Sequence, residues 1–122
     1  MYRYYNANPK GRLVNDCTVR AFALANDVCW DCAYTALSIF AQEERIMPDD
    51  VSYIDKFLTD RYPKVYESRA HDSITVKDFV CSHPRGTYLI TMNGHITCCK
   101  DGCVYDTFNP LDRIVWDAYK IK

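Results

Sequence analysis

The sequence lacks a long apolar segment and a run of basic residues. No stretch approaches the roughly 18 apolar residues that span a bilayer, and the opening residues MYRYYNANPKGRL lack the apolar run of a signal peptide. Charged residues make up 25% of the chain with a net charge of -1, so there is no basic stripe to follow a phosphate backbone. We therefore expect a cytoplasmic protein with neither a membrane nor a nucleic-acid partner.

Internal repeats and low-complexity segments are also missing from the sequence. At about 100 to 200 residues per domain, a chain of 122 residues predicts one compact domain spanning 1-122. The sequence does not fix the oligomeric state.

Cysteine is abundant, but its number is odd. Seven cysteines without an export signal disfavour a disulfide framework, so we expect reduced thiols. Zinc is the alternative, because Cys29 and Cys32 form a C-x-x-C motif and Cys98, Cys99 and Cys103 cluster later. Cys98 and Cys99 are consecutive in a predicted strand and point to opposite faces, so they cannot easily share one metal. We expect small buried residues at these positions, and neither a metal nor a cofactor.

A central helix is predicted from Cys17 to about Asn26. Asp16 is a favourable N-cap residue, and its spacing to Arg20 suits an i,i+4 ion pair. The segment VRAFALA leaves little polar surface, which is expected of a helix buried in the middle of a domain.

A second helix is predicted from apolar residues at the i, i+3, i+4, i+7 spacing. We assign this stripe to the core, together with Trp116. The stripe consists of Trp30, Ala33, Tyr34, Leu37, Phe40 and Ala41.

Two further helices follow along the chain. The third is predicted to start after Pro48, because acidic residues occupy its first turn and apolar residues recur on one side. These apolar residues are Val51, Ile54 and Leu58. The fourth is short: it begins at Thr75 with the capping-box-like sequence TVKD and ends at His83-Pro84.

The hydrophobic period changes to two after Gly86, which indicates β-strands. The runs TYLITM, HITCCK, CVYDTF and RIVWDAYKI are separated by NG, DG and NPLD, and Asn-Gly and Asp-Gly favour tight hairpins. An antiparallel meander after helices predicts the α+β class. The Tyr-rich start, with Tyr2, Tyr4 and Tyr5, fits either a sheet-edge strand or a substrate wall.

The hairpin around Asp101-Gly102 predicts a pair of polar side chains. If these two residues form the turn, Thr97 faces Asp106 and His95 faces Phe108, so all four lie on one face of the sheet. Asp106 is then diagonal to His95 and within reach of its ring. An imidazole oriented by a carboxylate is the base of a nucleophilic triad. The other two histidines, His71 and His83, lie in predicted loops and receive no role.

Cys17 is the candidate nucleophile. A thiol at a helix N-terminus has its thiolate favoured by the helix dipole, and a neighbouring imidazolium favours it further. The Cys17 backbone N–H also belongs to the first turn, where it is open to a developing oxyanion. The alternative is that Cys17 is only a small buried residue at the start of a helix.

These residues resemble a known family. A buried helix opened by Cys, followed by helices and an antiparallel sheet with "GH" at a strand start and Asp on the next strand, resembles the papain-like cysteine peptidase clan. The segments NPKGRLVNDCTVRAFALA, WDCAYTAL, HPRGTYLITMNGHITCCKDGCVYDTF and VWDAYKI are similar to small uncharacterised papain-like proteins of bacteriophages and bacteria. The resemblance covers nearly the whole chain. If the chain is encoded by a phage, the expected location is the cytoplasm of the host cell.

The resemblance implies a thiol hydrolase that cleaves a peptide or isopeptide bond in a peptide or protein substrate through an acyl-enzyme. Cys17 is then the nucleophile, His95 the base and Asp106 the residue that orients the ring. Papain-like enzymes usually carry a Gln before the cysteine as an oxyanion donor, but residues 1-16 contain no Gln. Asn8 and Asn15 are the available amides. We favour Asn8, since Asn15 is too close to Cys17 in sequence.

Two other functions compete with this hypothesis. The chain could keep the fold without the activity and act as a binding protein, for example a phage factor that engages a host protein. A cell-wall amidase is the third hypothesis, although no export signal or wall-binding module accompanies it. A nucleophilic Cys17 should react with an electrophile faster than the other six cysteines.

Overall fold

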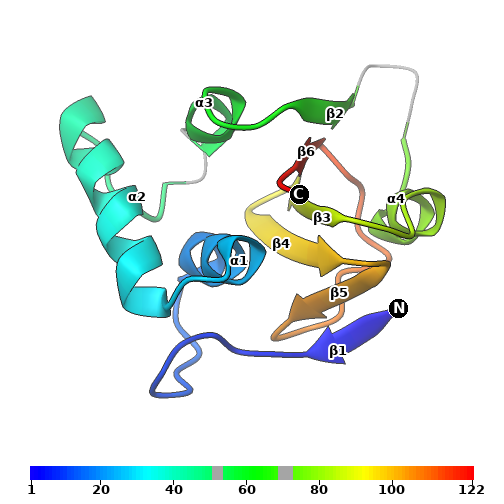
Figure 1. The fold of residues 1–122 in the computed structure, drawn as a ribbon, viewed down its shortest axis with the longest axis horizontal. Helices are drawn as coiled ribbons and strands as arrows, with labels where there is room; N and C mark the ends of the chain where they lie inside the picture. The colour runs from blue at the N-terminus through cyan, green and yellow to red at the C-terminus, as the bar shows by residue number, and fades with distance from the viewer. Residues whose placement is uncertain (51–53, 69–72) are drawn as a thin grey trace.

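The computed structural model describes residues 1–50, 54–68 and 73–122, which form an α+β fold (Figure 1). A mixed sheet lies between helices α1 to α3 on one side and α4 on the other. The elements in chain order are β1 (Tyr2–Tyr4), α1 (Cys17–Asn26), α2 (Trp30–Glu44), α3 (Ile54–Thr59), β2 (Lys64–Glu67), α4 (Val76–Ser82), β3 (Thr87–Met92), β4 (His95–Lys100), β5 (Cys103–Asp106) and β6 (Asp117–Lys120).

The six strands have the order β1-β5-β4-β3-β6-β2. Strands β3, β4 and β5 form the predicted consecutive hairpins, but the prediction of a simple meander is wrong for the last strand. β6 crosses back to pair antiparallel with β3, on the edge opposite to β4. The Tyr-rich start becomes β1, an edge strand parallel to β5, and the unpredicted β2 closes the other edge beside β6. All pairs except β1 with β5 are antiparallel.

The turn between β4 and β5 adopts the predicted register. Asp101 and Gly102 have φ angles of 48° and 78°, as a type I′ turn requires at both central positions. Cys99 consequently lies opposite Val104. A shift by one residue would send every side chain of β5 to the other face of the sheet, so this turn determines which residues share the site.

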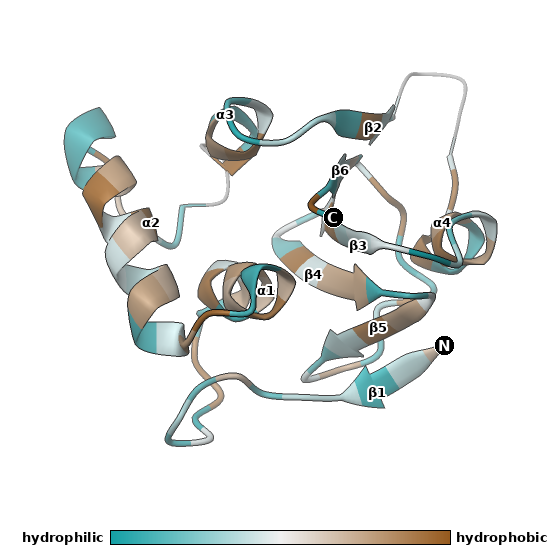
Figure 2. Cartoon of the chain, viewed as in Figure 1, coloured by the Kyte–Doolittle hydropathy of each residue, from teal (hydrophilic) through white to brown (hydrophobic). Residues whose placement is uncertain are grey.

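Helix α1 is the central helix of its layer. It packs against β4, β3 and α2, and six of its ten residues are buried. Figure 2 shows apolar colouring along most of it. The helix ends at Asp27, which has a left-handed φ of 54°. The Asp27 N–H donates to the carbonyl oxygens of Ala23 and Leu24 in the last turn.

Helix α2 buries a narrower stripe than its periodicity predicts. Ala33, Leu37 and Ala41 are buried, and burying one Leu side chain contributes about 1.5–3 kcal/mol. Tyr34 is 45% exposed, so its assignment to the core is wrong. The same holds for Trp116, which is 48% exposed just before β6. Figure 2 shows polar and apolar segments alternating along α2, as expected of a helix with one face in solvent.

Helices α3 and α4 differ in how well their starts follow the prediction. Residues 48–49 form a turn, and the described part of α3 begins only at Ile54; Val51 lies outside the described residues. For α4 the capping box is confirmed. The Thr75 hydroxyl accepts from the Asp78 N–H at 3.1 Å, and the Asp78 carboxylate accepts from the Thr75 N–H at 3.0 Å.

The core consists of two clusters separated by the sheet. The first joins α1, α2 and α3 to one face, including Leu89 and Cys98. The second joins α4 to the opposite face, where Phe79 and Cys99 are fully buried. Consecutive residues of β4 thus point to opposite faces, as predicted for Cys98 and Cys99. Among the helices of the described segments, none has the length and apolar character that crossing a membrane requires.

Candidate active site

Cys17 is the first residue of α1, and its side chain is 7% exposed. Asp16 precedes Cys17 at the predicted N-cap position. Contrary to the prediction, its side chain makes no capping hydrogen bond. Its carboxylate instead accepts hydrogen bonds from Asn8, Arg20 and Trp30. The predicted Asp16–Arg20 pair is confirmed, with 2.7 Å between Oδ1 and Nε. The first-turn N–H groups therefore lack a side-chain cap from Asp16 beside the thiol.

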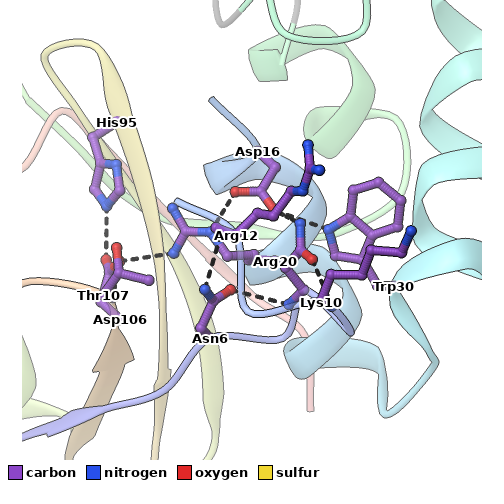
Figure 3. Close-up of polar contacts among 10 residues, drawn as sticks. Asn6, Lys10, Arg12, Asp16, Arg20, Trp30, His95, Asp106 and Thr107 are labelled. Carbon is purple, nitrogen blue, oxygen red and sulfur yellow. Dashed lines mark hydrogen bonds and ion pairs between the residues drawn. The ribbon is translucent and has the colours of Figure 1, made fainter. Parts of the chain in front are cut away.

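His95 and Asp106 meet on one face of the sheet, as the hairpin register predicts. His95 opens β4 and Asp106 ends β5, and the His95 Nε2 lies 2.7 Å from the Asp106 Oδ2 (Figure 3). Thr97 is buried against Asp106. The Phe108 ring packs on the imidazole, with 4.6 Å between centroids. The ring is therefore held by a carboxylate at one edge and by an aromatic neighbour.

Cys17 and His95 are neighbours in the site. Both line one surface cavity, and each shifts the pKa of the other. Because Nε2 is engaged by Asp106, Nδ1 is the ring nitrogen left for the thiol. The structure thus brings together the three residues that the sequence singles out, in the order thiol, imidazole, carboxylate.

The surroundings favour the charged forms of both Cys17 and His95. Burial by itself raises the pKa of the Cys17 thiol, but the hydrogen bond and charge of His95, with a backbone hydrogen bond from Ile96, hold it below its ordinary value. Burial likewise lowers the pKa of His95, yet hydrogen bonds with Asp106 and Cys17 raise it to about 9. A thiolate beside an imidazolium is the reactive form of a nucleophilic cysteine.

Asp106 remains a carboxylate in this environment. Burial raises its pKa, but the hydrogen bond and charge of His95, together with hydrogen bonds from Thr97 and the Thr107 N–H, keep the pKa below the ordinary value. The Thr107 backbone N–H donates to its Oδ1 at 2.7 Å. The main chain of Asp106 is fixed as well, because its carbonyl oxygen accepts from the Tyr5 N–H and the Tyr2 hydroxyl. Strand β1 therefore anchors the position of this residue.

Arg20 links the two carboxylates of the region, which the sequence did not reveal. Its Nε donates to Asp16 and its Nη1 donates to Asp106 Oδ1 at 3.2 Å (Figure 3). The side chain is 11% exposed, so this is a largely buried bridge between α1 and β5. The i,i+4 spacing predicts the first contact only. The second depends on how α1 packs across the sheet.

The Asn8 amide, the predicted oxyanion donor, bonds to the carboxylate beside Cys17. Its Nδ2 donates to the Asp16 Oδ2 at 3.3 Å, and its Oδ1 accepts from the Lys10 N–H within the loop. The alternative amide, Asn15, donates to Asp49 at 3.2 Å. The backbone N–H of Cys17, which has no carbonyl four residues earlier within the helix, remains as the available donor.

Of the two other histidines, His83 takes no part in this arrangement. His83 stacks on Phe79 with 4.0 Å between ring centroids, and its Nδ1 lies 2.9 Å from the Phe79 carbonyl oxygen. This is a contact of the α4 layer, on the opposite face of the sheet. His71 lies outside the described residues.

The cysteines fall into buried and exposed groups, and all are free thiols. Cys98, Cys99 and Cys103 are buried as predicted, whereas Cys29 and Cys32 are exposed, so the prediction of buried residues is wrong for this pair. Within the described segments no group of three or more His, Cys, Asp or Glu side chains is arranged to hold a metal ion. Helix α2 begins between these two cysteines, which places them on the surface.

Trp30 has a polar role that its aromatic spacing did not indicate. Its Nε1 donates to Asp16 Oδ2 at 2.9 Å, and its ring stacks on Tyr34 with 5.1 Å between centroids. It packs only partly against the core. Trp30 therefore connects the start of α2 to the carboxylate beside Cys17.

A surface cavity of about 260 Å³ opens at Cys17 and His95. Leu13, Val14 and Phe108 contribute apolar walls. Residues 13–15 and 107–108 thus line the same cavity as the Cys17 thiol. The cavity could admit an extended chain with an apolar side chain near the reacting bond.

The comparisons with known proteins give no relative: no family model, no curated protein and no solved structure matches the chain.

Proposed function

We propose that this chain is a small papain-like thiol hydrolase that cleaves a peptide or isopeptide bond through an acyl-enzyme. One observation carries the proposal: the His95 ring, hydrogen-bonded to Asp106 at 2.7 Å through Nε2, lines the same surface cavity as Cys17 at the start of α1. Base, orienting carboxylate and nucleophile thus lie in one site, which a merely buried cysteine does not require.

The reaction follows from the roles of the three residues. The Cys17 thiolate attacks the substrate carbonyl carbon, and the protonated His95 then gives its proton to the leaving amine as the C–N bond breaks. The thioester that remains is attacked by water, from which His95 takes a proton. Collapse of this second intermediate breaks the C–S bond, releases the carboxylic acid and restores the thiolate. Asp106 keeps the ring oriented and stabilises its positive charge throughout.

The chain order of the site supports the papain-like assignment. The nucleophile begins a central helix, the histidine begins a strand after a tight turn, and the carboxylate ends the next strand of the same hairpin. Helices precede an antiparallel group of strands, as in the clan that the sequence resembles. The seven free thiols suit the reducing conditions of the cytoplasm, where we place the protein.

The cavity at the thiol supports a peptide or protein substrate. Its walls are apolar at Leu13, Val14 and Phe108, and Arg20 also lines it. Leu13 is 76% exposed, so a substrate side chain placed there would cover apolar surface.

Site-resolved alkylation with iodoacetamide tests the proposal. We expect Cys17 of folded protein to react at least about 10-fold faster near pH 6 than Cys81, an exposed thiol on α4, because only Cys17 has an imidazolium beside it. Peptide mapping by mass spectrometry reports each cysteine separately. Cys17→Ala, at matched folding, should abolish hydrolysis of an unfolded protein substrate such as casein. Equal hydrolysis by this variant would remove Cys17 from the mechanism.

A catalytically inactive binding protein is the second candidate, and one observation favours it. Both amides near the thiol, Asn8 and Asn15, are bonded to carboxylates, so the oxyanion would depend on backbone donors. Under this hypothesis Cys17 alkylates rapidly but no thioester forms. Mass spectrometry after mixing with an activated ester separates the two, since only a hydrolase acylates at Cys17 and then turns over.

A further inference from the structure

The start of α2 carries a pair of thiols outside the candidate active site. Cys29 is the N-cap residue of this helix and Cys32 lies in its first turn, so the pair is a C-x-x-C motif at the N-terminus of a 15-residue helix. Their sulfur atoms are 3.2 Å apart and share a hydrogen bond. Both residues are exposed, whereas Cys98, Cys99 and Cys103 on the sheet are buried. The close approach and the exposure are two independent features of the pair.

We propose that Cys29 and Cys32 form a redox-active dithiol that exchanges with low-molecular-weight disulfides. A disulfide bond is about 2.05 Å long, so the sulfur atoms need to approach by only about 1 Å. The loop that the bond would close spans the four residues of the motif, and short loops gain little stability from a cross-link. Such a bond is easily reduced again, which is the property of an exchanging disulfide rather than a structural one.

Cys29 is the attacking thiol of the pair. Its sulfur accepts from the Cys32 backbone N–H at 3.3 Å and lies at the positive end of the helix dipole, both of which favour a thiolate. The hydrogen bond with the Cys32 thiol, followed by the Cys32 N–H, lowers the pKa of Cys29, and the same thiol contact raises the pKa of Cys32. Cys32 therefore remains protonated as the resolving thiol.

A surface cavity beside Cys29 indicates the size of the partner. It has a volume of about 390 Å³, and Tyr5, Pro9 and Trp30 contribute to its walls. This volume suits a small disulfide such as oxidised glutathione better than a protein loop. The N-terminal segment and the start of α2 thus line the approach to the attacking sulfur.

The exchange balances in two steps. The Cys29 thiolate attacks one sulfur of the disulfide RSSR, forming a mixed disulfide and expelling RS⁻. Cys32 then loses its proton, its sulfur attacks the Cys29 sulfur, and the second RS⁻ leaves as the intramolecular bond forms. The two protons of the protein thiols end on two RSH molecules. The protein dithiol is oxidised by two electrons, and one RSSR is reduced to two RSH.

The test incubates the reduced full-length chain in glutathione buffers of increasing oxidised fraction, followed by acid quenching and alkylation. Trypsin cuts after Arg20 and Arg45, so Cys29 and Cys32 fall in one peptide that contains neither Cys17 nor Cys81. We expect this peptide to lose two hydrogens reversibly. Cys81, an exposed thiol without a second cysteine in its motif, is the internal control for ordinary glutathionylation.

Single variants separate the two roles. Cys29→Ser should fold because Ser caps helices well, and Cys32→Ser should fold because Cys32 is exposed. Cys32→Ser should trap one glutathione on Cys29 at least about 10-fold faster than on Cys81, while Cys29→Ser should lose this fast reaction. If the peptide never forms the internal bond, or if Cys29 reacts no faster than Cys81, the proposal is wrong. The same cycle in Cys17→Ala keeps this result independent of the hydrolase proposal.

Discussion

Arg20 and Asp106 belong to different layers of the fold and meet at 3.2 Å between Nη1 and Oδ1. Arg20 holds Asp16 through its Nε, while His95 takes the second oxygen of Asp106. The carboxylate is thus fixed between a cation of α1 and the imidazole of β4. Helix α1 carries both Cys17 and Arg20. Through Arg20 and Asp106 it therefore also helps to orient the His95 ring.

Arg20→Gln should weaken both the fold and the site. Removing the cation leaves two poorly solvated carboxylates without compensation, so we expect about 3 kcal/mol less free energy of unfolding, measured with urea. The Cys17 alkylation rate should fall as well. Arg20→Lys should restore only part of the stability, because one ammonium cannot hydrogen-bond to Asp16 and Asp106 as the guanidinium does. Arg12→Gln, at an exposed position, is the matched control. A loss within about 0.5 kcal/mol of that control would contradict the bridging role.

Asp106→Asn should impair proton transfer while preserving shape. The amide keeps the size of the side chain but removes the charge that helps to raise the pKa of His95 to about 9. We expect hydrolysis to fall about 100-fold or more, with a lower His95 pKa visible by NMR titration. Asp112→Asn, outside the site, serves as the matched carboxylate control. An unchanged His95 titration would show that Asp106 does not hold the ring in solution.

The pH profile of Cys17 alkylation should reveal the thiol–imidazole pair. Because His95 lowers the pKa of the thiol, the rate in folded protein should already be substantial near pH 6. His95→Ala should move the profile upward, toward an ordinary thiol that ionises near about 8.5. Cys81 in the same samples gives the exposed-thiol profile. Superimposed profiles of wild type and variant, both rising only above pH 8, would refute the pair.

Stability should depend on pH differently with and without the thiol. The raised pKa of His95 adds stability below its unfolded value of about 6.5, which is lost as pH rises through the folded value of about 9. The lowered pKa of Cys17 adds stability above its unfolded value of about 8.5, which is lost as pH falls through the folded value. The two effects oppose each other between these limits.

Cys17→Ala removes the second effect and the part of the first that the thiol contributes, while the hydrogen bond and charge of Asp106 still raise the His95 pKa. We expect its free energy of unfolding to decline from about pH 6.5 upward, whereas the wild type stays flatter. Urea unfolding of both proteins from pH 6 to pH 9 under reducing conditions measures this difference. Parallel curves would mean that the thiol and the imidazole titrate independently.

Trp30→Phe should separate the hydrogen bond of Trp30 from its ring stacking. Phe can still stack on Tyr34 but cannot donate to Asp16, so we expect a loss of about 1 kcal/mol in the free energy of unfolding. Trp116→Phe is the control, because the exposed Trp116 contributes main-chain hydrogen bonds that the substitution retains. Equal losses in the two variants would argue against a role for the indole N–H.

Local rules were sufficient to place much of the candidate site. The Asp101-Gly102 turn allows only one register, and the two-residue period of the strands then puts His95 and Asp106 on the same face. The start of α1 at Cys17 follows equally from the neighbouring sequence. Both predictions depend on residues within one hairpin or one helix, where chain geometry decides the outcome.

Contacts between layers could not be predicted in this way. Arg20 and Asp106 are 86 positions apart, and nothing in either neighbourhood indicates that α1 crosses β5 at that point. The exposure of Tyr34 has a similar reason. Periodicity indicates which face of a helix is apolar, but the elements packed against that face decide how much of it is buried. The short strand β2, with charged residues at both ends, carries too weak a pattern to be recognised.

The parallel pairing of β1 with β5 has a consequence for protein synthesis. A ribosome releases β1 and Cys17 well before the strands that carry His95 and Asp106. The growing chain therefore carries an ordinary thiol with no imidazole beside it, and its first strand has nothing to pair with. Any hydrolytic activity therefore has to wait until β4 and β5 have also emerged and folded onto α1.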